Sequence, residues 1–439
     1  MGRVFETLSA AVGSGADAGA AAAAQRVRIA PGDTGLSARL STGDLALDSV
    51  TFFASQVSRL LGLPSITVEP RRVGVNFSSY NYLSINEEPA AAWAPLSGFF
   101  ATADGWVRTH ANYPHHRARL CRAFGLPEMA SREQLAAALQ RLEAKHAEEL
   151  AFAAGALCVR VREPEEFAEL IAPAPLLEWQ ADAGGTGLRQ AQRSAAPRVL
   201  DFSRVIAGPT ATRALALIGA DVLRIDPPEP AEIEMQHIDT GAGKRSAVLD
   251  LAQNAELLHE LLAGADAVVL GYRSGSLDRF GLSEQSLRER YPHLVIASLS
   301  AYPQGSAWAE RRGFDSLVQA ASGIALIEGD TIKPGVLRAQ ALDHATGYML
   351  AGGICAALAE GRPATVRASL AATAQALIGL GPSNAADAPL PTDAAALDSE
   401  LETVPSAAGS LRRARVIVDV AGHPQGPVVP LGSSEPAWL

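Results

Sequence analysis

The chain has 439 residues, of which 48% are hydrophobic, and its formal net charge is -10 at pH 7. That length suffices for about two or three domains, and the composition can supply each of them with a hydrophobic core. The acidic balance and the lack of any basic run argue against a nucleic-acid-binding surface. Three widely spaced cysteines, Cys121, Cys158 and Cys355, fit neither a disulfide framework nor a zinc knuckle. They predict reduced thiols in a cytoplasmic protein.

The N-terminal segment is rich in Ala and Gly, and we predict a flexible leader over residues 1–40. Glu6 and Asp17 interrupt its apolar residues, so it lacks the hydrophobic core of a signal peptide. No window of the sequence approaches the ~20 apolar residues that a membrane-spanning helix requires. These features predict a protein that is neither exported nor embedded in a membrane.

From residue 197 onward, short β-branched runs alternate with helical patterns, which is typical of a parallel α/β sheet. The predicted strands are residues 198–207, 221–226, 265–272 and 293–302, and the predicted helices are residues 208–220 and 254–265. Ligands of such sheets bind beyond the carboxyl ends of the strands. We therefore expect the site in the loops that follow Val205, Asp226, Tyr272 and Leu299.

Two segments rich in Gly, Ala, Pro and Asp predict linkers on either side of this unit, one at residues 181–196 and one at the start of residues 378–439. Ahead of it, residues 132–159 show helical periodicity, and we predict a small α+β domain over residues 41–180. Residues 46–62 and 341–358 share an Ala-Leu-Asp entry into an apolar helix. This similarity is explained by coincidence, or by a partial duplication in which Asp48 matches Asp343.

The turn at residues 208–210 joins a strand to a helix, where free backbone N–H groups favour an anion, although an ordinary strand–helix turn explains it equally well. It lacks the G-x-G-x-x-G fingerprint, which argues against NAD even though Asp226 ends the second strand. The sequence GAGKRS lacks the first glycine of a phosphate loop, so Lys244 and Arg245 are either phosphate contacts or solvated residues. The nine histidines show no ligand spacing, and we expect no metal.

Asp343 stands where an extended segment, residues 334–342, gives way to a helical pattern over residues 344–360. One interpretation is an ordinary helix N-cap. The other is a nucleophilic carboxylate, since a helix N-terminus would keep the group ionised and its N–H groups would stabilise charge during attack.

Six segments follow one another from residue 198: RVLDFSRVIAGPTATRALALIGADVLRID, GKRSAVLDL, GYRSGSLDRFGLS, HLVIASLSAYPQG, RRGFDSLVQAASG and ALDHATGYMLAGGICAAL. In this order they resemble the family III CoA-transferases, which include formyl-CoA and carnitine CoA-transferases and α-methylacyl-CoA racemase. The resemblance implies a doubly wound, Rossmann-like large domain over residues 197–377, a small α+β domain and an interlocked homodimer. It also implies that Asp343 is the nucleophile.

The resemblance further implies an activity and a binding site. The activity is transfer of coenzyme A from an acyl-CoA to a carboxylic acid through an aspartyl-CoA thioester, without a metal or NAD. The implied contacts to coenzyme A are Val205, Leu249, Tyr272, Arg273, Arg279 and Phe280. These residue types fit, because arginines pair with phosphates and aromatic rings cover adenine or pantetheine.

The sequence departs from the family in several places. Residues 93–127 resemble the small-domain segment that normally follows the catalytic aspartate, so the domain order is rearranged or partly duplicated. Residues 409–433 resemble a shortened closing segment, and the glycine-rich loop that covers the active site of formyl-CoA transferase is absent. Phe314 replaces the histidine of the racemase relatives, which favours transfer. A racemase or isomerase of the same fold and a CoA-binding pseudoenzyme are the alternatives.

Overall fold

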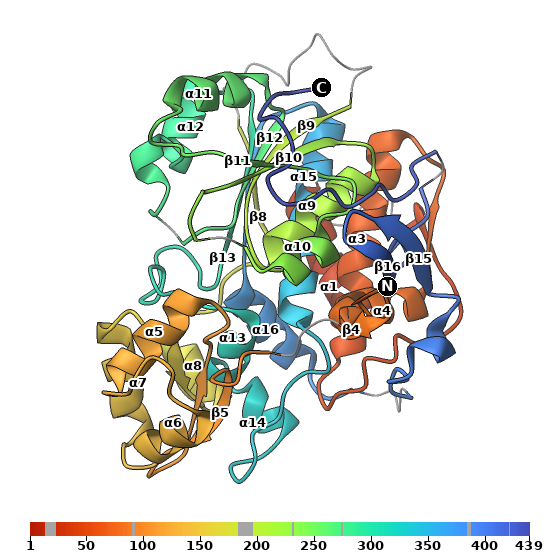
Figure 1. Cartoon of the computed structure of the whole chain (residues 1–439). Coiled ribbons are helices and arrows are strands. Elements are labelled where there is room, and N and C mark those ends of the chain that lie inside the picture. The colour runs from red at the N-terminus through yellow and green to blue at the C-terminus, as the bar shows by residue number, and fades with distance from the viewer. Residues whose placement is uncertain are drawn as a thin grey trace.

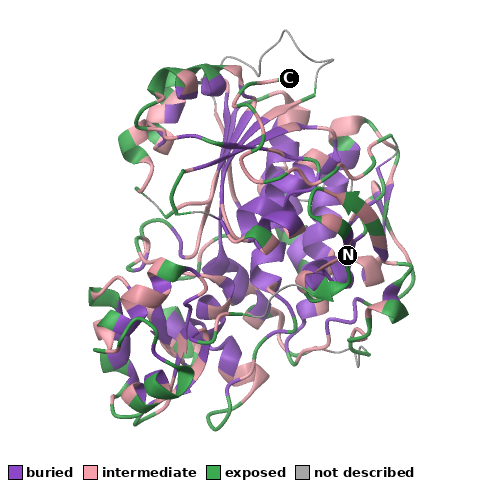
Figure 2. Ribbon diagram, viewed as in Figure 1, coloured by how far each residue is buried: buried purple, intermediate pink, exposed green. Residues whose placement is uncertain are grey.

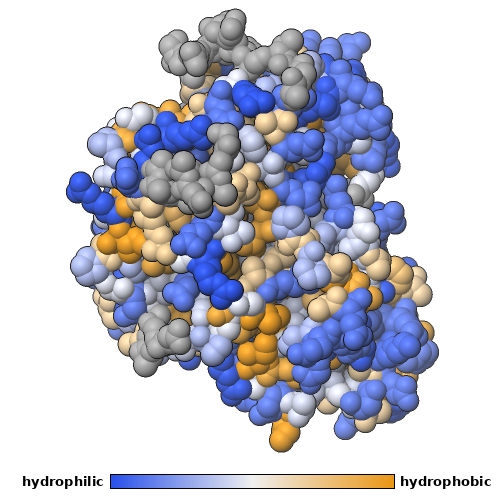
Figure 3. Space-filling model, turned by 180° about the vertical axis from the view of Figure 1, so that it is seen from behind, coloured by the Kyte–Doolittle hydropathy of each residue, from blue (hydrophilic) through white to orange (hydrophobic). Residues whose placement is uncertain are grey.

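The computed structural model describes residues 1–13, 23–89, 93–182, 196–230, 232–273, 275–383, 388–420 and 422–439. A seven-stranded sheet runs through the middle of the molecule, and buried residues concentrate on this sheet and on the helices beside it (Figure 1, Figure 2). The rear surface is largely hydrophilic, with hydrophobic side chains in separate patches (Figure 3). Among the described residues, no helix combines the length and hydrophobicity that a membrane crossing requires.

The strand order of the large sheet is β11-β10-β9-β12-β13-β14-β8. Neighbours from β11 to β14 pair in parallel, whereas the edge strand β8 is antiparallel to β14. The chain builds outward from β9 to β11 and then returns to β12 on the other side of β9. The strands are β8 (Glu178–Ala181), β9 (Arg198–Phe202), β10 (Asp221–Asp226), β11 (Arg245–Val248), β12 (Ala267–Leu270), β13 (Val295–Ser300) and β14 (Ala364–Ser369). All four predicted strands are confirmed.

Helices cover both faces of this sheet. Val199 and Val222 belong to a hydrophobic core shared with α9 (Ala207–Leu217) and α15 (Ala341–Glu360). Their strand neighbours Leu200 and Leu223 belong to a second core, shared with α11 (Ala255–Gly264) and α12 (Glu284–Arg290). Because alternate residues of the central strands β9, β10, β12 and β13 are buried on opposite faces, these strands are nearly continuous apolar runs in the sequence.

Helix α15 is the central helix of the first core. All its residues from Ala341 to Ala357 are buried, as expected for a helix whose surface is apolar or small on every side. It packs between α9 and α3 (Thr42–Leu61) (Figure 1). Gly352 permits the close approach to α3, because a Cβ atom at this position would lie 2.4 Å from Cε1 of Phe52.

We expect Gly352→Ala to destabilise the protein by about 1–3 kcal/mol, since a methyl group forced against the Phe52 ring overpacks this helix contact. The matched control is Gly379→Ala in the exposed last turn of α16 (Leu370–Leu380), where an added Cβ would meet nothing within 4 Å. Urea denaturation should show a lower midpoint for the first variant and no loss for the second. Equal midpoints would contradict this account of the α3–α15 contact.

The N-terminal segment is not a flexible leader where the structure describes it. Residues Arg3–Val12 form α1, which buries Val4, Phe5 and Leu8 and packs against α3. The Asp48 carboxylate accepts hydrogen bonds from the backbone N–H groups of Gly2, Val4 and Phe5, at 2.8–3.2 Å. The high Ala and Gly content of the segment obscured the helical spacing of its apolar residues, which are buried against α3. Residues 14–22 of the predicted leader lie outside the described residues.

The segment predicted as one small domain, residues 41–180, contributes to three parts of the structure. Helix α3 and the parallel pair β1 (Val27–Ile29) and β2 (Ile66–Val68) join the main core. β3 (Ser84–Ile85) and β4 (Glu88–Pro89) pair with the C-terminal hairpin of β15 (Leu401–Ser406) and β16 (Gly409–Ala414). The remainder forms a separate body with its own core, at the lower left of Figure 1.

This separate body, called here the small body, covers residues 98–170. Its three antiparallel strands are β5 (Gly98–Ala101), β6 (Trp106–Thr109) and β7 (Cys158–Arg160). Its helices are α5 (Pro114–Ala123), α6 (Arg132–Leu139), α7 (Ala144–Ala153) and α8 (Pro164–Leu170). Of the predicted linker at residues 181–196, positions 183–195 lie outside the described residues.

The remaining helices connect these parts. They are α4 (Pro70–Phe77), α10 (Glu234–Thr240), α13 (Asp315–Ala321) and α14 (Ile324–Glu328), with short 3-10 turns at η1 (Ser79–Asn81), η3 (Asp278–Phe280) and η4 (Ala394–Leu397). Helix α13 contacts β6, β7 and α15, so it links the small body to the central helix.

Candidate active site

A cavity of about 340 Å³ opens beyond the carboxyl ends of four parallel strands. It is lined by Val205 after β9, Pro227 after β10, Tyr272 after β12 and Leu299 at the end of β13. These positions match the loops predicted from the sequence, and they flank the point where the strand order reverses between β9 and β12. The small body lines the same cavity with Tyr113, His115 and His116.

Asp343 is the third residue of α15 and lines this cavity while only 6% exposed. No described group donates a hydrogen bond to its carboxylate. The N–H groups of Leu342 and Asp343 instead donate to Oδ2 of Asp315, at 2.9 and 3.1 Å. Asp315 therefore accepts the free N–H groups at the N-terminus of α15, and Asp343 does not cap this helix.

The charge state of Asp343 differs from the sequence-based expectation. Burial and the nearby charge of Asp315 raise the pKa of Asp343 well above its usual range, so the helix end does not hold it ionised at low pH. Burial also raises the pKa of Asp315 to about 6, although hydrogen bonds from Asp343 N–H and Gln319 oppose this rise. The two carboxylates form a coupled pair, of which Asp343 lines the cavity.

A buried network of charges shapes the wall beside β9. Glu232 accepts hydrogen bonds from Nη2 of Arg224 at 2.7 Å, from the Tyr113 hydroxyl at 2.5 Å and from Val205 N–H at 3.2 Å. Val205 has φ of 72°, a left-handed conformation that a β-branched residue rarely adopts. Arg224 also pairs with Asp226, so Asp226 is engaged within the protein. The network fixes a strained turn at the cavity wall and ties the small body to it.

The structure brings together four of the residues singled out from the sequence. Val205, Tyr272, Arg273 and Asp343 all line the cavity. Tyr272 is oriented so that its buried hydroxyl has no hydrogen-bond partner among the described residues, and burial raises its pKa.

The other three predicted CoA contacts lie elsewhere. Arg279 stacks over the Phe280 ring at 4.6 Å, and both line a separate pocket beside α11. Leu249 is buried in the core between α11 and the sheet, so its side chain lines neither space. The six CoA contacts implied by the resemblance stay a prediction, with three of the residues lining the cavity and three lying beside α11.

Two basic residues considered from the sequence have structural partners. Lys244 is buried and contacts Oδ2 of Asp201 at 3.2 Å and Thr212 Oγ1 at 2.5 Å. Arg245 forms a bidentate ion pair with Asp221. Lys244 is therefore not solvated, whereas Arg245 is partly exposed. Neither residue lines the cavity, so neither is placed to meet a substrate phosphate there.

Several residues of the cavity were missed by sequence reasoning. The small body contributes His115 and His116, and the segment before α13 contributes Arg311 and Arg312. Together with Arg204 and Arg273, these arginines make the cavity wall basic in a protein whose net charge is -10. The cluster of aromatic and imidazole side chains in Tyr113-Pro114-His115-His116 is visible in the sequence. Its place in the cavity depends on a contact with Phe314, about 200 residues away, which the sequence does not reveal.

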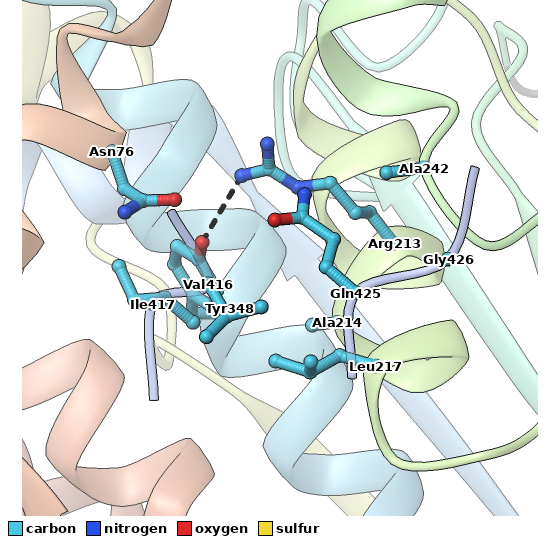
Figure 4. Close-up of a pocket in the computed structure, with 10 residues that line it drawn as sticks. All are labelled: Asn76, Arg213, Ala214, Leu217, Ala242, Tyr348, Val416, Ile417, Gln425 and Gly426. Carbon is cyan, nitrogen blue, oxygen red and sulfur yellow. Dashed lines mark hydrogen bonds between the residues drawn. The ribbon is translucent and has the colours of Figure 1, made fainter. Parts of the chain in front are cut away.

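A second, far smaller cavity is lined by residues of α9, by Tyr348 of α15 and by the segments 416–417 and 425–426 (Figure 4). Arg213 donates from Nη2 to the Tyr348 hydroxyl at 3.3 Å, and Asn76 and Gln425 face the same space. Its volume of about 20 Å³ is that of one water molecule. It does not share residues with the cavity at Asp343, and we assign it no substrate.

Comparison with known proteins shows what the chain resembles. It is 32% identical over 177 residues to the probable fatty acyl-CoA transferase Rv3272 of Mycobacterium tuberculosis, covering 37% of this chain and 45% of that protein. It is 29% identical over 181 residues to human succinyl-CoA:glutarate CoA-transferase, covering 37% and 41%. Formyl-CoA:oxalate CoA-transferase of Escherichia coli is 31% identical over 176 residues, covering 37% and 42%. The chain thus spans less than half the length of these relatives.

Among solved structures, the crystal structure of Rv3272 aligns at a TM-score of 0.40 with 29% identity, covering 44% of this chain and 56% of that one. The profile of CoA-transferase family III matches residues 74–176 and 196–388. These segments include the small body, the parallel sheet and the helix that carries Asp343. Because they make up more than half of its length, the chain belongs to CoA-transferase family III.

Proposed function

We propose that this protein transfers coenzyme A from an acyl-CoA to a carboxylic acid and that Asp343 is its nucleophile. The observation that carries the proposal is a buried carboxylate without hydrogen-bond donors among the described residues, which faces a cavity with a basic wall. A carboxylate that is poorly solvated and uncommitted to a structural role is more nucleophilic once ionised. The names of the aligned relatives support the same chemistry.

In the proposed reaction, a carboxylate oxygen of Asp343 adds to the thioester carbonyl of the donor and expels CoA thiolate, which leaves a mixed anhydride. The thiolate then attacks the aspartyl carbonyl and releases the donor acid. The acceptor carboxylate attacks the resulting aspartyl-CoA thioester, and the reverse steps form the new acyl-CoA. CoA held in the cavity attacks at high effective concentration, and burial of Asp343 limits hydrolysis.

We further propose that residues 197–377 act as the CoA-binding large domain, a doubly wound, Rossmann-like unit, and that the active form is a homodimer. The helices on both faces of the sheet and the reversal of strand order beside the cavity support the first proposal. The dimer rests on the family resemblance alone. Size-exclusion chromatography with light scattering would test it, and a monomer that is fully active would contradict it.

Racemisation would need a second acid or base opposite Asp343. Phe314, which also lines the cavity, carries no proton, and the neighbouring His344 packs into the core against Phe77 and Thr210. The histidines left for such a role are His115 and His116 of the small body, so the reaction must be tested directly. Incubation with a panel of acyl-CoA thioesters and carboxylic acids, followed by intact-mass analysis, should show a covalent adduct and a new acyl-CoA. Deuteration at the α-carbon in deuterated water without any acceptor acid would instead identify an epimerase.

Arg273 and Arg279 offer a test of where the CoA phosphates bind. Because Arg273 lines the cavity and Arg279 lines a separate pocket, we expect Arg273→Ala to weaken CoA binding about tenfold, ~1.4 kcal/mol, and Arg279→Ala to have a smaller effect. Both side chains are exposed, so solvent screens part of each interaction. Isothermal titration calorimetry with CoA measures both constants. Unchanged affinity in both variants would remove the arginines from the proposed site.

A further inference from the structure

His116 is a buried polar side chain that the proposed mechanism does not yet use. It is the third residue of α5, is 5% exposed and lines the cavity together with Asp343. Its Nδ1 has no hydrogen-bond partner among the described residues. Burying a polar group without a partner is costly, so a buried imidazole left unpaired beside a cavity points to a partner supplied by a ligand.

Aromatic contacts, rather than hydrogen bonds, hold the His116 ring in place. The ring lies edge-on to Tyr113 and Phe314, with centroids 5.2 and 5.7 Å apart, and His115 packs against it at 4.2 Å. Phe314 directly precedes Asp315, whose carboxylate bonds the backbone of Asp343. The imidazole and the nucleophile are thus positioned by one continuous set of contacts, although they come from different parts of the chain.

The imidazole is neutral at physiological pH. Burial lowers the pKa of His116 to about 2, and the neighbouring His115, His110, Arg312 and Arg119 reinforce this effect. A neutral imidazole carries one N–H donor and no charge, so it does not neutralise the Asp343 carboxylate. It is suited to donate a hydrogen bond to an oxygen that becomes negative during a reaction.

Several other donors around the cavity are already engaged. The Tyr113 hydroxyl donates to Glu232, the Ser300 hydroxyl donates to the Tyr302 carbonyl, and Arg204 donates to the Pro230 carbonyl. The first N–H groups of α15, which would otherwise stabilise an oxyanion, donate to Asp315. The Tyr272 hydroxyl and His116 Nδ1 both lack a partner among the described residues, and His116 is the one that packs against Phe314, next to Asp315.

We propose that His116 is a catalytic residue whose N–H donates to the thioester carbonyl oxygen when Asp343 attacks, an assignment that rests on the proposed transfer function. As the bond between the Asp343 oxygen and the carbonyl carbon forms, the electron pair of the C=O bond moves onto the oxygen, and the His116 N–H stabilises that charge. Collapse of the adduct restores C=O and expels the thiolate. No proton leaves the imidazole, so no further reactant is required.

His116→Phe tests this role, because phenylalanine keeps the aromatic contacts and removes the donor. We expect kcat to fall about 100-fold or more, the effect typical of losing one oxyanion donor, with KM and CoA affinity little changed. His116→Gln retains an N–H donor and should recover much of that loss. His146→Gln, on the exposed face of α7 in the same small body, is the matched control and should behave like the wild type.

Circular dichroism and calorimetric CoA titration should first show that each variant is folded and binds CoA. The proposal is overturned if His116→Phe retains wild-type kcat, or if His116→Gln loses as much kcat as His116→Phe at normal CoA affinity. If the Phe variant fails to fold, the Gln variant decides alone, since a complete loss of kcat with intact CoA binding would contradict a donor role. Wild-type protein that transfers no CoA would refute the proposed function itself, a separate outcome.

Discussion

Asp343→Asn is expected to abolish CoA transfer, with a loss of at least about 1000-fold in kcat, because an amide cannot attack a thioester. The side chain is nearly isosteric, so the cavity and the helix N-terminus held by Asp315 should persist. Intact-mass analysis after incubation with an acyl-CoA should show an adduct on the wild type and none on the variant. Hydroxylamine should likewise inactivate only the acyl-CoA-treated wild type.

The same variant should be at least as stable as the wild type above neutral pH. The folded-state pKa of Asp343 is raised above the unfolded value of about 3.9, so the native protein holds this proton more tightly than the unfolded chain does. That contribution to stability is fully present below the unfolded pKa and is lost as pH rises through the raised folded pKa. The amide of the variant does not titrate, so thermal unfolding should show the relative advantage of Asp343→Asn growing with pH.

Asp48→Asn is the matched control for the transfer and hydroxylamine measurements. Asp48 ends an Ala-Leu-Asp sequence like the one at Asp343, but it is the seventh residue of α3, accepts hydrogen bonds from the backbone of α1 and lies outside the cavity. Transfer activity should be retained in this variant. If hydroxylamine inactivates acyl-CoA-treated Asp343→Asn as readily as wild type, the nucleophile is a different residue.

The parallel sheet was predictable because its physical cause is local. Strands buried on both faces, such as residues 221–226 and 295–300, are short apolar runs bounded by helices, and this pattern is visible without knowledge of their partners. Helix α1 was missed for the opposite reason. Its apolar face is short and set in an Ala-rich segment, and it is stabilised by Asp48 and α3, which lie more than thirty residues away.

Apart from Asp343, the cavity lining was predictable where a strand end carries the residue. Tyr272 and Arg273 follow β12 directly, and that position places them at the ligand-binding edge of the sheet. Arg279 is a few residues further along, yet the loop turns it toward α11 and a different pocket. His116 was unpredictable, since its role depends on the small body packing against residue 314, and no local pattern encodes that contact.

The charge state of Asp343 was also beyond local prediction. A helix N-terminus ordinarily lowers the pKa of a carboxylate, but here Asp315 occupies those N–H groups and adds a negative charge of its own. The two acidic residues are 28 positions apart and belong to different helices. The sequence therefore located the proposed nucleophile, but it revealed neither the burial nor the second carboxylate that together raise its pKa.

Asp315→Asn should move the acid limb of the kcat/KM profile toward lower pH. Asp343 must be ionised to attack, so activity is lost as pH falls through its pKa, and the charge of Asp315 raises that pKa. Because the pKa of Asp315 is itself raised to about 6, the wild-type limb reflects a coupled pair, whereas the variant should titrate as a single group. The amide oxygen of the introduced asparagine can still accept the N–H groups of α15.

The profile should be measured from about pH 4 to about pH 9, a range that brackets ordinary and raised carboxyl pKa values. Glu149→Gln, an exposed change of acid to amide on α7, should leave the limb where it is in the wild type. An acid limb that stays fixed in Asp315→Asn would mean that a group other than Asp343 limits the reaction at low pH. A shift in the predicted direction would instead show that the charge of Asp315 helps to set the pH at which Asp343 ionises. The same carboxylate accepts the N–H groups at the start of α15.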